Sequence, residues 1–109
     1  MTPNLPPAIA GYFATANAHD GAAMVRHFAP DALVIDEQQD RRGHAAIREW
    51  EAQAHAQYQP LAVPVSVETT GDDIVVTATV SGAFPGSPAT LHFTFRLSDG
   101  LITRLEITA

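Results

Sequence analysis

Two runs of apolar residues at helical spacing open the chain. In the first run, apolar positions recur every three or four residues, as on one face of a helix: Ile9, Tyr12, Phe13 and Ala16. Pro6-Pro7 suits the first turn of this helix, where a missing amide hydrogen costs little. Asp20 is a good N-cap for a second, short helix, which is expected to run through Met24 and Phe28 and to end near Pro30.

The third and longest helix is predicted from about His44 to Tyr58, and Pro60 stops it. Its apolar stripe consists of Ile47, Trp50, Ala54 and Tyr58. Ahead of this helix, Leu33-Val34-Ile35 is a short apolar run typical of a strand, and the polar stretch from Gln38 to Gly43 is turn-like. The first half of the chain therefore predicts helix, helix, strand and helix in that order.

The second half of the chain changes to a period of two, which indicates half-buried strands. The expected strands are Leu61–Val67, Ile74–Val80, Leu91–Leu97 and Leu101–Thr108. The turns between them are Gly71–Asp73, Pro85–Pro88 and Ser98–Gly100. Helices followed by antiparallel strands predict an α+β fold with one sheet face against the helices. The other face is richer in Thr, Arg and Glu, so we expect it to be wet or to form a homodimer contact.

Composition narrows the class of protein. A chain of 109 residues with 46% apolar residues predicts a single domain over residues 1–109 with one core. A membrane span needs about 18 consecutive apolar residues, and neither such a run nor a signal peptide is apparent. The absence of Cys fits the cytoplasm. A net charge of −6 argues against nucleic-acid partners.

Three segments of the first half form a more specific pattern. They are Asn17-Ala18-His19-Asp20, Phe28-Ala29-Pro30-Asp31-Ala32 and Arg42-Gly43-His44-Ala45-Ala46-Ile47-Arg48-Glu49-Trp50. The chain resembles, over nearly its whole length, the SnoaL-like branch of the NTF2-like superfamily, which includes ketosteroid isomerase. This resemblance implies a cone, in which three N-terminal helices pack on a curved, mostly antiparallel sheet. It leaves the function open, because members include isomerases, cyclases, hydrolases, dehydratases and binding proteins.

Comparison with ketosteroid isomerase implies roles for two residues. Aligned without gaps, Tyr12 falls on that enzyme's oxyanion-hole tyrosine and Asp36 on its general base. A carboxylate in an apolar cup would remove a proton beside a carbonyl while a phenol stabilises the enolate. A third group, a protonated acid that also donates, aligns with Leu91, which cannot donate a hydrogen bond. Steroid isomerisation itself is therefore not expected.

Each candidate also has a purely structural interpretation. Tyr12 on an amphipathic helix is more often a core aromatic residue, and Asp36 at a strand end is often a turn or cap residue. Glu37 would point to the opposite face if the strand continued. The residues expected to line the pocket are Phe13, Ala16, Phe28, Val34, Ile47, Trp50, Ala54, Leu91 and Phe93. Trp50 is expected to pack against the sheet as well.

The histidines do not suggest a metal site. His44 and His55 share a helix face but are separated by roughly 16 Å of helical rise. Glu51 and His55 are spaced to bind an ion together, yet no third ligand has convincing spacing. His92 is expected to point away from the pocket, toward a dimer contact, and His27 to lie at the rim. No metal or cofactor is therefore predicted.

The sequence lacks the motifs of phosphate-binding and serine-nucleophile sites. The glycines beside Pro85 lie in a turn without a following helix, so they form no phosphate loop. No serine has the setting of a nucleophile elbow. The basic pair Arg41-Arg42 adjoins Asp40 and is interpreted as a solvated loop.

Two hypotheses from different classes remain. The first is a protein that binds a small apolar ligand and has acid/base activity, of the isomerase or cyclase kind, through Asp36 and Tyr12. The second is a non-catalytic dimeric binding module with a vestigial pocket, which the missing acid at Leu91 favours. The sequence leaves open whether the protein is an enzyme.

Overall fold

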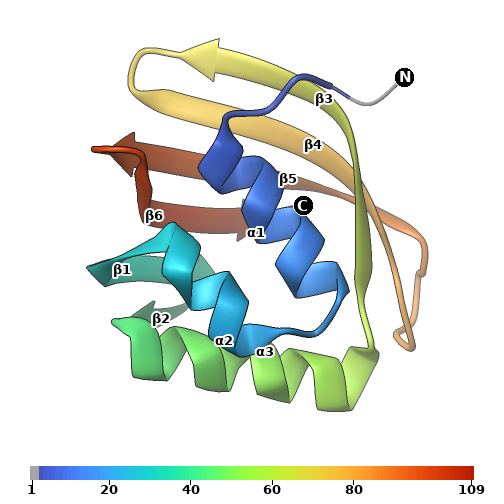
Figure 1. Cartoon of the computed structure of the whole chain (residues 1–109). Coiled ribbons are helices and arrows are strands. Elements are labelled where there is room, and N and C mark those ends of the chain that lie inside the picture. The colour runs from blue at the N-terminus through green and yellow to red at the C-terminus, as the bar shows by residue number, and fades with distance from the viewer. Residues whose placement is uncertain (1–2) are drawn as a thin grey trace.

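Residues 3–109 are described by a computed structural model, in which helices cover one face of a curved sheet (Figure 1). The helices are α1 (Pro7–Asn17), α2 (Gly21–Met24) and α3 (His44–Tyr58), and a 3-10 turn, η1 (Val25–His27), follows α2. The strands are β1 (Phe28–Asp36), β2 (Gln39–Arg42), β3 (Leu61–Thr70), β4 (Asp73–Ser81), β5 (Ala89–Ser98) and β6 (Leu101–Thr108). Within the described residues, no helix is long and apolar enough to cross a membrane.

The strands form one six-stranded sheet in the order β2-β1-β6-β5-β4-β3. Neighbouring strands are antiparallel except for β1 and β6, which run parallel. α1 contacts β3 and β6, whereas α3 contacts β1 and β2 at one edge of the sheet. The predicted α+β class and mostly antiparallel sheet are therefore found, and the helices lie together on one face of the sheet (Figure 1).

The ends of two helices follow from local chemistry. The Asp20 carboxylate accepts a hydrogen bond from the Ala23 amide at 3.1 Å, which confirms the predicted N-cap of α2. α3 has the predicted bounds: Gly43 precedes it with a φ of 88°, and Gln59 ends it with a φ of 47°. Positive φ is easy for glycine, and Pro60 then prevents the helix from continuing.

The predicted end of the second helix is wrong. Helical backbone stops at His27, and Phe28 already begins β1, which contains Pro30. Proline disfavours helical backbone in the residue before it, here Ala29. The β1–β6 register also shifts between Phe28 and Leu33. Pro30 has no amide hydrogen to donate, and it lies where the hydrogen-bond ladder between these strands is interrupted.

The predicted turn from Gln38 to Gly43 is corrected as well. Only Glu37 and Gln38 form the turn, with φ values of 53° and 64°, and Gln39–Arg42 is strand β2. Asp36 pairs with Gln39 across this two-residue hairpin, in which both turn residues have positive φ. β1 and β2 thus precede α3, so the three helices are not all N-terminal to the sheet.

The core lies between α1 and the sheet and is rich in aromatic rings. Tyr12 meets Phe28 and Phe95 edge to face, with ring centroids 5.8 and 5.6 Å apart. Phe13 meets Phe93 in the same way at 5.1 Å. Such edge-to-face pairs stabilise beyond their buried area. They hold α1 at a fixed height above the strands that carry the site.

The end of α1 is tied to strand β3 by one side chain. The Asn17 amide nitrogen donates to the Ala62 carbonyl at 2.8 Å, and its oxygen accepts from the Ala62 amide at 2.9 Å. Both backbone groups of Ala62 are therefore satisfied where β3 passes the helix. This contact fixes one wall of the cavity described next.

Candidate functional site

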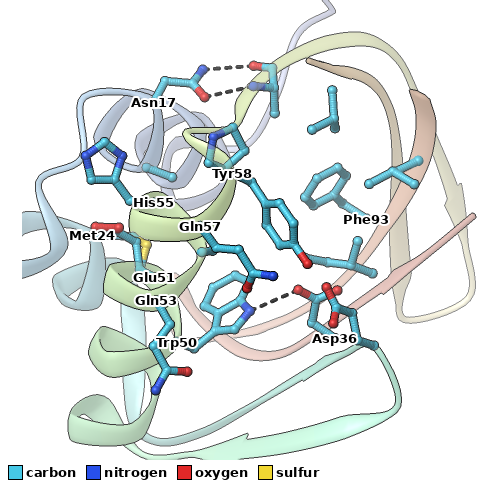
Figure 2. A pocket seen from close by; sticks show the side chains of 18 of the residues that line it. Asn17, Met24, Asp36, Trp50, Glu51, Gln53, His55, Gln57, Tyr58 and Phe93 are labelled. Carbon is cyan, nitrogen blue, oxygen red and sulfur yellow. Dashed lines mark hydrogen bonds between the residues drawn. The ribbon is translucent and has the colours of Figure 1, made fainter. Parts of the chain in front are cut away.

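A cavity of about 390 Å³ lies between the helices and the concave side of the sheet. That volume falls within the range of small-molecule sites, about 300–1,000 Å³. Its aromatic lining residues are Tyr12, Phe13, Trp50, Tyr58, Phe84 and Phe93. Figure 2 shows Trp50 and Tyr58 from α3 and Phe93 from β5 around one space, with Asp36 at its lower edge. The cavity is thus mainly apolar with a carboxylate at one end.

Most of the residues predicted to form the pocket line this cavity. They are Asp36, Tyr12, Phe13, Ala16, Trp50, Ala54, Leu91 and Phe93. The expectation is corrected for Phe28, Val34 and Ile47, which lie in the core at 1%, 0% and 0% exposure. Val34 on β1 and Ile47 on α3 belong to elements that pack directly together, so neighbouring side chains cover them.

Asp36 is held by an indole. Trp50 Nε1 donates a hydrogen bond to Asp36 Oδ2 at 3.0 Å, which joins the last residue of β1 to the middle of α3 (Figure 2). Trp50 is 8% exposed, so its ring is itself fixed by packing. Among residues 3–109, no donor occupies the other carboxylate oxygen, Oδ1. Asp36 therefore has one oxygen anchored and one able to accept a proton.

Tyr12 brings a protonated phenol to the same cavity. Its ring is 4% exposed, and no group in the described part of the chain forms a hydrogen bond with its hydroxyl. Burial raises the pKa of Tyr12 far above its ordinary value, and the negative charges of Asp36 and Glu51 raise it further. The hydroxyl is thus a permanent hydrogen-bond donor at neutral pH.

This raised pKa predicts a loss of stability in alkali that depends on Tyr12. Above about pH 10 the unfolded phenol ionises while the buried one keeps its proton, so unfolding releases a proton. The free energy of unfolding should then fall with pH by up to about 1.4 kcal/mol per unit for this group. Urea unfolding from about pH 9 to about pH 11 measures the slope. Tyr12→Phe should reduce it, and equal slopes would contradict the burial of the phenol.

The turn after β1 places Glu37 beside the cavity. Glu37 was expected on the opposite face only if the strand continued, and β1 ends at Asp36. Strand alternation stops at Asp36, and the left-handed backbone of Glu37 redirects its side chain. The solvated loop predicted for Arg41-Arg42 is corrected, because both residues belong to β2. Alternation along β2 puts Arg41 in the lining, whereas the exposed Arg42 donates to the Asp31 carbonyl at 3.1 Å.

Several polar lining residues were not predicted. Tyr58 was recognised on the apolar stripe of α3, but its place at the cavity depends on the β4–β5 loop. There the Ala83 amide donates to the Tyr58 carbonyl at 2.7 Å, and Phe84 meets the Tyr58 ring at 6.0 Å. The ring centroids of His19 and His55 lie 3.5 Å apart with the ring planes tilted by 32°, a contact between distant parts of the chain that no local pattern indicates.

The remaining histidines lie outside the cavity lining. His44 Nε2 donates to the Phe28 carbonyl at 2.9 Å, and His92 Nδ1 lies 3.1 Å from Thr77 Oγ1 on the adjacent strand. The His27 ring lies so close to Gly11 that a Cβ there would be 2.2 Å from it, so His27 packs on α1 and is not a rim residue. Within residues 3–109, no three His, Cys, Asp or Glu side chains are grouped to hold a metal ion.

A family model and similar solved structures point to the same protein family. The family model described as "SnoaL-like domain" matches residues 9–105. A putative polyketide cyclase from Sinorhizobium meliloti is 41% identical, with a TM-score of 0.91 and 95% of each chain covered. TerC, crystallised with polyporic acid, is 25% identical, with a TM-score of 0.75 over 92% of this chain and 86% of that one.

A more distant structure shows the fold alone. It is a protein with a ketosteroid isomerase-like fold from Catenulispora acidiphila, crystallised with trimethylamine, which is 18% identical with a TM-score of 0.84. The alignment covers 97% of this chain and 87% of that one. No curated protein matches the sequence.

Proposed function

The chain belongs to the SnoaL-like domain family, and we propose that it binds a small, largely apolar carbonyl compound and moves a proton on it with Asp36. The observation that carries this proposal is the hydrogen bond from Trp50 Nε1 to Asp36 Oδ2 at 3.0 Å. It leaves a carboxylate with one free oxygen at the edge of an aromatic cavity that also contains the Tyr12 phenol.

The proposed reaction begins with proton abstraction. Asp36 Oδ1 takes a proton from the carbon next to the ligand carbonyl, the C–H electron pair moves into a carbon–carbon double bond, and the carbonyl oxygen becomes an enolate. The Tyr12 hydroxyl donates a hydrogen bond to that oxygen and stabilises its charge. Little solvent reorganisation is needed, because neighbouring rings fix Tyr12 and the hydrogen bond from Trp50 fixes Asp36.

Two continuations of this reaction keep the atoms balanced. Asp36 can return the proton to another carbon of the same enolate, which is an isomerisation. Alternatively, the enolate carbon can attack a second carbonyl of the ligand, forming a carbon–carbon bond while the attacked oxygen takes the proton. The 41% identity to a putative polyketide cyclase supports the second continuation. The apolar side chain of Leu91 in the lining supports a reaction that needs only one strong oxyanion donor.

Deuterium exchange tests the shared first step. Cyclohexyl methyl ketone is a small apolar probe whose α-hydrogens exchange slowly in neutral buffer. With the protein in D₂O, NMR should show exchange faster than in buffer containing the unfolded protein. Equal rates, together with ketone binding, would contradict a base role for Asp36 and leave a binding protein.

A dimeric binding module is the second candidate, and a surface feature favours the dimer. Leu61, Val63 and Val65 are 47%, 54% and 52% exposed and alternate along the edge strand β3. Leu61 and Val63 therefore lie on one face, and Val65, at the register shift between Pro64 and Ser66, adds a third exposed apolar side chain. Large apolar groups gathered in this way are typical of contact surfaces. We expect a homodimer mass in sedimentation at micromolar protein. A monomer there would contradict the dimer.

A further inference from the structure

The charges around the cavity are unbalanced. Three carboxylates line it, those of Asp36, Glu37 and Glu51, against the single guanidinium of Arg41. In the part of the chain that the structure describes, none of the three carboxylates forms an ion pair. The two ion pairs found there, Arg96–Asp73 at 2.7 Å and Arg104–Glu106 at 3.3 Å, lie outside the lining.

The one lining guanidinium offsets only one of these three negative charges. Arg41 Nη1 donates to Gln39 Oε1 at 2.9 Å, two residues away on β2. The lining histidines lie away from the carboxylates of the β1–β2 turn. His55 is on the opposite side of the cavity from Asp36 (Figure 2), and His19 lies next to His55. The end formed by Asp36 and the exposed Glu37 carries two negative charges against the one positive charge of Arg41, which leaves it with a negative potential.

Aromatic walls and unused acceptors lie next to these carboxylates. The rings of Trp50, Tyr58 and Phe93 line the same cavity as Asp36 (Figure 2). The face of an aromatic ring attracts a cation. The Tyr12 hydroxyl is a second, independent feature that points to a ligand. It is part of a side chain that is only 4% exposed and lines the cavity, and within residues 3–109 it has no hydrogen-bond partner. Its oxygen, like Asp36 Oδ1, can accept a hydrogen bond from an ammonium group.

We propose that the natural ligand is cationic: its apolar body carries a protonated amine, bound between the aromatic walls and the carboxylates of the β1–β2 turn. This inference rests on the proposed function for the location of the site. Glu37 is the main counter-ion, because Asp36 is needed as the base and Glu37 adjoins it on the same turn. An anionic ligand of the same size would instead meet unpaired carboxylates.

Three probes with the same number of non-hydrogen atoms separate charge from shape. They are N,N-dimethylcyclohexylamine, which is protonated at neutral pH, cyclohexyl methyl ketone, which is neutral, and cyclohexanecarboxylate. Titration calorimetry should give the order amine, ketone, carboxylate, with the amine at least about 10-fold tighter than the ketone. Raising the salt concentration from about 50 mM to about 500 mM should weaken the amine and leave the ketone unchanged.

Two variants that each remove one negative charge locate the effect. Glu37→Gln should weaken amine binding by about 3- to 10-fold and ketone binding by less. Glu68→Gln is the matched control, because Glu68 is exposed on β3 and outside the lining. It should leave all three affinities unchanged. An equal loss in both variants would overturn Glu37 as the counter-ion.

The outcomes distinguish this inference from the proposed function. Ketone binding with deuterium exchange, but without preference for the amine, overturns the cationic ligand and supports the acid/base role. Tight amine binding, with ketone that binds but does not exchange, supports the cationic ligand and overturns the acid/base role. Tightest binding of the carboxylate, or binding of none of the three probes, overturns the cationic ligand.

Discussion

Asp36→Asn is expected to slow deuterium exchange on cyclohexyl methyl ketone by at least about 100-fold, the lower end of what a positioned general base contributes. Asparagine keeps the shape of the side chain and can still accept the hydrogen bond from Trp50 Nε1 through its amide oxygen. It cannot take a proton from carbon. The exchange rate per protein molecule, followed by NMR, measures the loss.

The control for this variant is Asp40→Asn. Asp40 lies on β2, is exposed and is outside the cavity lining, so the same change of charge occurs near the site without altering it. Exchange should stay at the level of the unchanged protein. The free energy of unfolding of Asp36→Asn should fall by no more than about 1.5 kcal/mol, the size of one ordinary hydrogen bond. Exchange that survives Asp36→Asn would show that another group is the base.

Phe28→Ala should destabilise the protein by about 3–5 kcal/mol, as is usual for a large aromatic residue removed from a core. Phe28 is 1% exposed and meets the Tyr12 ring edge to face at 5.8 Å. Its loss leaves a hole beneath α1 that the curved sheet cannot easily close. Urea unfolding followed by tryptophan fluorescence measures the change, since Trp50 is the only tryptophan.

The matched substitution for Phe28→Ala is Phe84→Ala. Phe84 is half-buried and lines the cavity, so its removal widens the space that a ligand fills and removes less buried area. We expect a loss of stability well below that of Phe28→Ala. If Phe84→Ala were the more destabilising change, the assignment of Phe28 to the core and Phe84 to the cavity would be reversed.

The helices and long strands were predictable because local pattern and tertiary packing agree there. α3 has the bounds that Pro60 and its apolar stripe indicate, and β6 has the bounds that alternation predicts. β2 could not be found in this way, because its four residues are polar and are strand only through pairing with β1. The predicted helix end near Pro30 is wrong for a similar reason. Pro30 fits into strand β1 only because the pairing of β1 with β6 is interrupted there, and that depends on a distant part of the chain.

The site was predictable in part. Spacing and resemblance predict Asp36, Tyr12 and Trp50 as site residues, and all three line the cavity. Pattern identifies which side chains face inward, but not whether a neighbour covers them. For this reason Val34 and Ile47, which face inward as predicted, lie in the core and not at the cavity. Glu37 lies beside the cavity because its own backbone is left-handed, with a φ of 53°. Glycine or asparagine would have indicated such a turn in the sequence, but glutamate does not.

A crystal structure of the protein with cyclohexyl methyl ketone would test most directly whether the cavity is a working site. The ketone should lie against Trp50 and Phe93, with its oxygen within hydrogen-bonding distance of the Tyr12 hydroxyl and its α-carbon facing Asp36 Oδ1. Side chains that fill the cavity and exclude the ketone, or an Asp36 carboxylate turned away from Trp50 into solvent, would contradict this account.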